Sequence, residues 1–178
     1  ILCGNLKSWS NRCFKGIEKE KWHEIVSESE LLYDRLRRVV IKADDNESTY
    51  DDIAERLSQY PCVLCIVNSR KDAEEIYNRL PQRGRFHLSS LMYPKHVDKN
   101  IDEIKNRLKV KTPILRVVAT QLVEAGVDMD FPVVFRQETG LDSILQAAGR
   151  CNREGRLKMG HTYVFRLNHR PTKGALSN

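Results

Sequence analysis

Short apolar runs alternate with longer amphipathic segments along most of this chain. The runs that read as strands lie at residues 39–41, 63–67, 86–89, 114–119, 133–135 and 162–166. Between several of them lie segments of helix length, and one places Ile101, Ile104 and Leu108 at helical spacing. Because a helix commonly connects parallel strands, the alternation predicts an α/β fold, a mostly parallel sheet with helices on both faces.

The expected elements have definite limits. Helices are expected after a cap at Ser48 or Thr49 through residue 57, over 71–80 and over 94–110. The first strand, within residues 36–42, is expected to break at the polar run 44–46. We expect one domain at 36–167, a lead-in from a preceding domain at 1–35 and a basic tail at 168–178. The start at Ile1 rather than Met suggests a piece of a longer chain.

Composition excludes several classes of protein. Hydrophobic content of 40% and charged content of 30% favour a soluble globular protein. The longest apolar runs reach about half of the length that spans a bilayer, so no membrane segment is expected. Five cysteines form no disulfide framework, which favours a reducing compartment. Cys62 and Cys65 have C-x-x-C spacing, but on a strand they point to opposite faces, so no metal site is predicted.

The net charge of +6 is concentrated near the C-terminus. From Arg150 onward, seven basic side chains accompany one acidic side chain, Glu154, so the rest of the chain is balanced. A basic C-terminal quarter favours polyanions such as nucleotide phosphates or a nucleic-acid backbone, although basic tails are common.

The segment at residues 146–155 carries the most specific pattern. If it is a helix, Gln146, Arg150 and Arg153 share one face, and Gly149 leaves the backbone open beside the first arginine. An amide and two guanidinium groups on one edge suit phosphate oxygens. The alternative is a solvated arginine face.

Polar groups also follow three predicted strands. They include Ser69 and Arg70 after the second, Ser90 after the third and Thr120 after the fourth. The carboxyl ends of parallel strands share one edge, so these groups could hold a sugar–phosphate backbone without reading its sequence. Each is alternatively an ordinary helix cap.

Three stretches resemble motifs of superfamily 2 helicases. Residues 119–130, Ala-Thr-Gln-Leu-Val-Glu-Ala-Gly-Val-Asp-Met-Asp, resemble motif V, and residues 146–153, Gln-Ala-Ala-Gly-Arg-Cys-Asn-Arg, resemble motif VI. Residues 65–69 resemble motif IV. The sequence of residues 146–155 is similar to that of the CRISPR-associated helicase-nuclease of type I interference systems. The resemblance covers residues 36–167 and implies the second RecA-like domain of a two-domain motor.

The resemblance also implies roles for single residues. It assigns Arg150 and Arg153 as arginine fingers toward the γ-phosphate of ATP, with Gln146 positioning the nucleotide or linking it to the sheet. Gly126, Asp128 and Gly149 would border the nucleotide, and Thr120, Ser69, Arg70 and Ser90 would face single-stranded DNA. Alternatively, Asp128 is a turn residue and Thr120 a strand-end cap. Implied partners are the first RecA-like domain and a Cascade-type complex in a prokaryotic cytoplasm.

Several expected helicase parts are absent from the sequence. It contains no G-x-x-x-x-G-K-[ST] phosphate loop, no Asp-Glu pair at the end of a strand that resembles the Mg²⁺-binding motif II, and no HD-type nuclease motif. ATP and Mg²⁺ would therefore be bound mainly by the first domain, and this chain alone is expected to be inactive. A second hypothesis is a RecA-like nucleic-acid or protein-binding module without motor activity. A dinucleotide-binding domain is disfavoured because no G-x-G-x-x-G is present.

Overall fold

A computed structural model of the protein describes residues 36–89, 92–109, 114–121 and 127–168. The expected lead-in at 1–35 and the expected tail, apart from Asn168, lie outside these residues.

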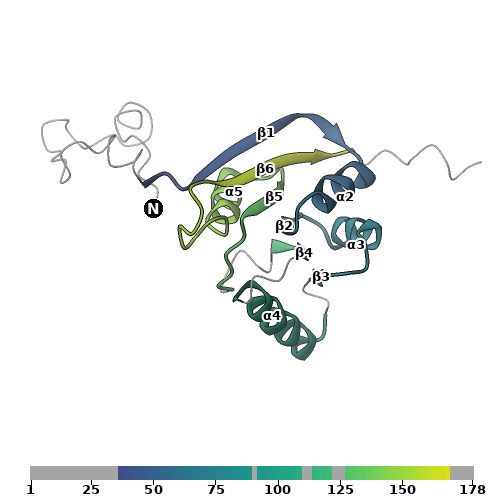
Figure 1. Ribbon diagram of the computed structural model, residues 1–178. Coiled ribbons are helices and arrows are strands. Elements are labelled where there is room, and N and C mark those ends of the chain that lie inside the picture. Colours follow the sequence, from purple (N-terminus) through teal and green to yellow (C-terminus); the bar gives the residue numbers. More distant parts are fainter. Residues whose placement is uncertain (1–35, 90–91, 110–113, 122–126, 169–178) are drawn as a thin grey trace, which may run out of the picture. The chain divides into compact units, whose positions relative to one another are not determined.

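Within the described residues, six strands form one sheet in the order β1-β6-β5-β2-β4-β3 (Figure 1). Every neighbouring pair is parallel. The strands are β1 (Val39–Ser48), β2 (Cys62–Ile66), β3 (Arg85–Leu88), β4 (Leu115–Ala119), β5 (Val133–Gln137) and β6 (Gly160–Leu167). The parallel α/β sheet expected from the alternating pattern is confirmed.

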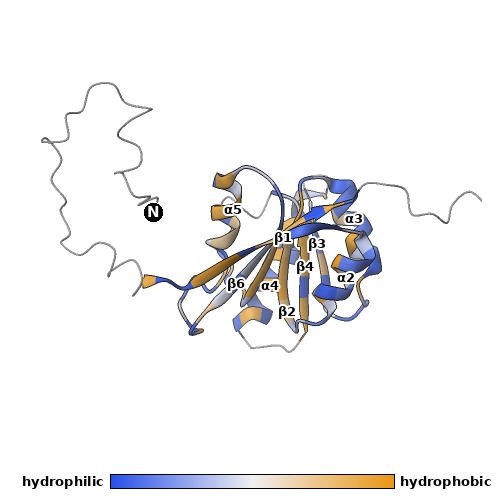
Figure 2. Ribbon diagram, turned by 90° about the horizontal axis from the view of Figure 1, so that it is seen from above, coloured by the Kyte–Doolittle hydropathy of each residue, from blue (hydrophilic) through white to orange (hydrophobic). Residues whose placement is uncertain are grey.

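Helices cover both faces of this sheet (Figure 1). They are α2 (Tyr50–Ser58), α3 (Arg70–Arg79), α4 (Pro94–Lys109) and α5 (Leu141–Ala148). On one face, α2 and α3 bury Ile53, Leu57 and Ile76. On the other, α4 and α5 bury Ile104 and Ala147. The central strands are mostly apolar (Figure 2) and buried along their whole length, because side chains on both of their faces are covered.

The two cysteines of the C-x-x-C pattern lie on β2. Cys65 belongs to the apolar cluster beneath α2 and α3, whereas Cys62 packs against the cluster on the opposite face. Both thiols are free. Side chains alternate between the two faces of a strand, so positions three apart point to opposite faces. The two sulfurs therefore cannot share a metal ion.

Helix α2 begins where its capping residues predict. The Thr49 hydroxyl accepts a hydrogen bond from the Asp52 N–H at 3.2 Å, and the Asp52 carboxylate accepts one from the Thr49 N–H at 2.8 Å. This reciprocal pair is a capping box, so Thr49 rather than Ser48 is the cap.

Two expectations about the limits of elements are wrong. The run Asp44-Asp45-Asn46 does not break the first strand, because β1 continues to Ser48 with a register shift between Ala43 and Glu47. Strand β1 is at the edge of the sheet with many exposed side chains, so a bulge can absorb polar residues there.

The second correction concerns the arginines. Helix α5 ends at Ala148, so Arg150 and Arg153 are not on one helical face with Gln146. The helix cannot continue because Asn152 adopts a left-handed φ of 45°, and Cys151 forms a parallel β-bridge with Phe131. Both arginines lie in the turn that follows the helix.

Candidate functional site

The turn after α5, residues 149–155, is here called the arginine loop. Its backbone is attached to the segment that enters β5: the Phe131 N–H donates to the Arg150 carbonyl at 2.9 Å, and the Asn152 N–H donates to the Phe131 carbonyl at 2.9 Å. Because Phe131 precedes β5, the arginine loop lies at the amino end of that strand. It is also next to the start of β6, where a Cβ on Gly160 would lie 2.6 Å from Cys151 Sγ.

Two side chains fix the shape of this loop. Asn152 is 2% exposed, and its amide bonds to the Arg38 carbonyl and to both backbone groups of Leu157. The Asp130 carboxylate accepts hydrogen bonds from the backbone N–H of Arg153 at 2.7 Å and of Glu154 at 3.3 Å. The motif resemblance assigned neither residue a role. The signal for Asn152 was its tolerance of left-handed backbone at a turn.

Three predicted site residues, Arg150, Arg153 and Asp128, lie close enough for their charges to interact. Arg153 Nη1 lies 3.4 Å from Asp128 Oδ1, and both side chains are partly exposed. Burial and the like charge of Arg153 lower the pKa of Arg150, and the Asp128 carboxylate partly opposes this shift. The charge of one guanidinium destabilises the charged form of the other, and a nearby anion stabilises both. The arrangement therefore favours a group with several negative oxygens.

Two further nucleotide candidates, Gln146 and Gly149, lie at the end of α5. Gln146 is exposed, whereas its neighbours Ala147 and Ala148 are buried. A Cβ on Gly149 would meet only the carbonyls of Leu145 and Gln146, at 3.3 Å or more, so the outer side of the backbone is open. Among the described residues, no group of three or more His, Cys, Asp or Glu could hold a metal ion. These residues fit a phosphate, but they do not fit Mg²⁺.

Three of the predicted nucleic-acid residues, Ser69, Arg70 and Thr120, lie at the carboxyl ends of the strands, here called the carboxyl edge of the sheet. Ile66, Ala119 and Leu88 are in one register row, so the loops after β2, β4 and β3 leave the sheet together. Ser69 caps α3 by accepting the Asp72 N–H at 3.0 Å, and Arg70 is exposed in the first turn. Thr120 follows β4 but is only 9% exposed.

A buried polar network supports this edge. Arg136 is fully buried at the end of β5, and its Nη1 donates to the Asn68 side-chain oxygen at 2.7 Å. The Asn68 N–H donates to Gln137 Oε1 at 2.7 Å, and Gln137 Nε2 donates to Asp72 at 3.4 Å. The network holds the loop before Ser69 in one conformation. In the sequence, the only indication of this network is that Arg136 directly follows the apolar run at 133–135.

The structure thus separates the predicted site residues into two groups. Arg150, Arg153 and Asp128 meet at the amino end of β5, whereas Ser69, Arg70 and Thr120 lie at the carboxyl edge. Gly126 and Ser90 lie outside the described residues.

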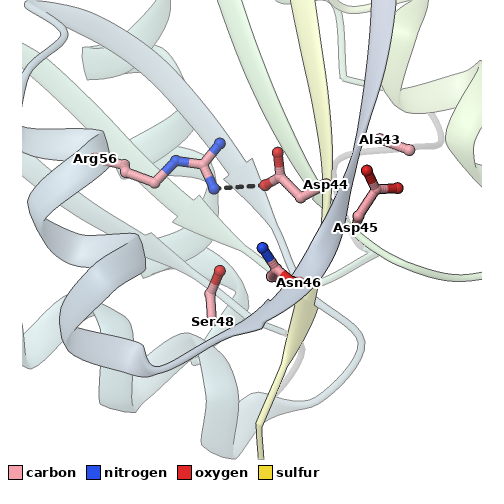
Figure 3. Close-up of a pocket in the computed structure, with 6 residues that line it drawn as sticks. All are labelled: Ala43, Asp44, Asp45, Asn46, Ser48 and Arg56. Atoms are coloured by element: carbon pink, nitrogen blue, oxygen red, sulfur yellow. Dashed lines mark hydrogen bonds and ion pairs between the residues drawn. The ribbon is translucent and has the colours of Figure 1, made fainter.

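A shallow hollow lies elsewhere, at the bulge of β1 (Figure 3). It is lined by the backbone and side chains of the bulge, and Arg56 points into it to pair with Asp44 at 2.5 Å. The hollow contains no residue of either predicted group. Among the described helices, none has the length and apolar character needed to cross a membrane.

Three curated relatives carry the name CRISPR-associated nuclease/helicase Cas3, and two of them match over half of this chain or more. The protein of Methanothermobacter thermautotrophicus is 33% identical over 51% of this chain and 11% of its own length. A second, described as putative, from Methanocaldococcus jannaschii is 26% identical over 88% of this chain and 23% of its own length. The chain therefore spans less than a quarter of the length of these relatives.

Solved structures share the fold. The crystal structure of T. fusca Cas3-AMPPNP matches with a TM-score of 0.64 and 19% identity, over 74% of this chain and 18% of that one. The structure of Mycobacterium smegmatis helicase Lhr bound to ssDNA and AMP-PNP matches with a TM-score of 0.56 and 20% identity, over 73% of this chain and 20% of that one.

The family model described as "CRISPR-associated nuclease/helicase Cas3, C-terminal" matches residues 59–156, which is more than half of the chain. The matched region runs from the residue after α2 to the residue after the arginine loop, so it includes β2, β3, β4 and β5. This chain therefore belongs to the family of Cas3 C-terminal helicase domains.

Proposed function

We propose that this chain is the C-terminal motor domain of an ATP-dependent DNA helicase or translocase that acts in CRISPR interference. In this role it supplies the arginines of the loop at 149–155 to a nucleotide held by a first RecA-like domain. Its carboxyl edge forms part of a track for single-stranded DNA. The observation that carries the proposal is the meeting of Arg150, Arg153 and Asp128 on an anchored loop.

The anchoring of the loop supports a role in the transition state. Asn152 and Asp130 hold the backbone on both sides of the arginines, so the guanidinium groups need little reorganisation to meet developing charge. Arginine fingers contribute about 10³- to 10⁵-fold to turnover in related phosphoryl transfers. When bound, ATP and Mg²⁺ would supply the phosphoryl chemistry, and these side chains would bind and orient the phosphates.

The first experiment changes Arg153 to Ala in the intact protein that carries this domain. We expect DNA-stimulated ATP hydrolysis to fall by about 10³-fold or more. Arg156→Ala is the matched control, because Arg156 directly follows the arginine loop but pairs with Glu154. ATPase activity near wild type in Arg153→Ala would refute the assignment. Equal losses in both variants would show that the loop had merely been disturbed.

Charge and helix direction support the DNA track. The amino ends of α3 and α4 both lie at the carboxyl edge of the sheet, and their first turns expose Arg70 and Lys95. Helix amino ends and cations both favour phosphate oxygens. Contacts of this kind hold a backbone without reading its bases.

The track is tested by the salt dependence of binding to oligothymidine. Arg70→Gln should weaken binding and reduce the slope of log K against log salt by about 0.7, the value for one single-strand phosphate contact. Lys109→Gln is the control, because Lys109 is exposed at the far end of α4. Unchanged affinity and slope for Arg70→Gln would remove Arg70 from the track.

The chain alone should hydrolyse no ATP, because its sequence contains no phosphate loop and no Asp-Glu pair at the end of a strand. We propose that its partners are the first RecA-like domain and a Cascade-type complex in a prokaryotic cytoplasm. Prokaryotic relatives named Cas3 support this assignment. Measurable ATPase activity of the isolated chain would contradict the proposed division of the active site.

A binding module without motor activity is the competing function. It predicts tight and weakly salt-dependent binding of single-stranded DNA by the isolated chain. The motor proposal predicts weak binding, mainly through phosphates, that falls steeply with salt. The paired arginines favour the motor, because a binding module has no need of two guanidinium groups held beside an exposed carboxylate.

A further inference from the structure

Tyr93, at the carboxyl edge, exposes its aromatic ring, and its role in starting α4 does not explain this exposure. Tyr93 lies between β3 and α4 and is 62% exposed. Its backbone carbonyl begins α4 by accepting the N–H groups of His96 at 2.8 Å and Val97 at 3.2 Å. Any residue could provide that carbonyl, so the cap does not account for the ring.

The ring retains a surface that could receive a flat partner. Its contact in the part of the chain that the structure describes is His96, with ring centroids 5.9 Å apart and planes at 72°. Perpendicular rings meet edge to face, so at least one face of the tyrosine stays uncovered. Lys95 and His96, which follow in the first turn of α4, are also exposed.

The position of Tyr93 places it beside the proposed track. The Thr120 N–H donates to the carbonyl of Leu88, the last residue of β3, at 3.0 Å. The Met92 N–H donates to the Ser89 carbonyl at 3.1 Å, which keeps the start of the α4 connection close to that strand end. Strands are about 4.8 Å apart, so the loops after β2, β4 and β3 begin within about 10 Å of one another.

We propose that Tyr93 stacks on a base of the single strand whose phosphates are held at the carboxyl edge. This inference rests on the proposed function and adds a base subsite to its phosphate contacts. Stacking on an aromatic ring is tolerant of sequence, because every base has a π-face. A contact of that kind suits a translocating motor, because the bases that pass it differ in sequence.

The test uses the intact protein and oligothymidine with a single 2-aminopurine, whose emission is quenched when it stacks. Tyr93→Leu removes the ring but keeps an apolar side chain, whereas Tyr93→Phe and Tyr93→Trp keep a ring. We expect the Leu variant to bind about 5- to 100-fold more weakly and to lose the quenching at one position of the label. The Phe and Trp variants should retain both.

Arg70→Gln separates the inference from the function on which it rests. It should weaken binding through a phosphate contact without changing the quenching at saturating protein. If Arg70→Gln weakens binding but Tyr93→Leu binds and quenches like wild type, the track stands and the base subsite is wrong. If the wild-type protein binds no single-stranded DNA, both are wrong. Equal thermal unfolding of the Leu variant and wild type shows that the fold is retained.

Discussion

Asn152 offers the strongest test of how the arginine loop is held. Its side chain makes three hydrogen bonds, two to Leu157 at 2.8 and 2.9 Å and one to the Arg38 carbonyl at 3.1 Å. It is 2% exposed, and its φ is 45°. Asn152→Ala removes all three bonds and places a residue with a Cβ but no polar side chain in left-handed backbone.

The expected loss follows from these contacts. Each lost hydrogen bond contributes about 1 kcal/mol, and the left-handed conformation costs about 1 kcal/mol more for Ala. Water can reach some of the exposed loop backbone, so we expect a net loss of about 3 kcal/mol in the free energy of unfolding. With a slope of about 2 kcal/mol per molar urea, the midpoint should fall by about 1.5 M.

Urea unfolding of the chain, followed by far-UV circular dichroism, measures this loss. The control is Arg156→Ala, an exposed residue directly after the arginine loop, which should change stability by less than about 0.5 kcal/mol. A loss below about 1 kcal/mol for Asn152→Ala would show that the loop does not depend on this amide. The account of how the arginines are preorganised would then be wrong.

Three further predictions concern other parts of the fold. Thr49→Ala should cost about 1 kcal/mol at neutral pH. The Thr49 hydroxyl also donates to the Asp52 carboxylate at 2.8 Å, and hydrogen bonds from Thr49 lower the pKa of Asp52, so the loss should become smaller as pH falls below about 4; a pH-independent loss would contradict this contribution. Gly160→Ala should destabilise the chain by about 1–3 kcal/mol, because its Cβ would lie 2.6 Å from Cys151 Sγ; unchanged thermal unfolding would count against this close contact. Burial raises the pKa of the Cys151 thiol to about 11, so iodoacetamide at pH 8 should label it only after unfolding, and mass spectrometry of the native chain checks this.

Local pattern was sufficient to predict most elements of the fold. Apolar runs such as that of β2 are buried on both faces, so their sequence reports their environment directly. Capping at Thr49 is equally local. The end of β1 was predicted wrongly, because local pattern treats Asp44 and its polar neighbours as a break. An edge strand tolerates such residues.

The candidate site was predicted less completely, because it depends on contacts between distant segments. The end of α5 depends on a bridge from Cys151 to Phe131 and on the bonds of Asn152 to Arg38, which no helical periodicity contains. The role of Asp130 could not be predicted for the same reason, because its carboxylate accepts a hydrogen bond from the backbone of the distant arginine loop. The roles of the arginines came from motif resemblance, whereas their placement at the amino end of β5 required the topology.

The pairing of the first strand with the last has a consequence for how this domain forms. Val39 pairs with Gly160, and Arg38 donates to the Arg153 carbonyl across a sequence separation of 115 residues. Closing a loop of that length costs about 4 kcal/mol of chain entropy before any contact offsets it. Contacts so distant in sequence form late in folding. During synthesis, the arginine loop therefore acquires its final shape only after β6 has emerged, and a prematurely terminated chain would present arginines that are not yet in position.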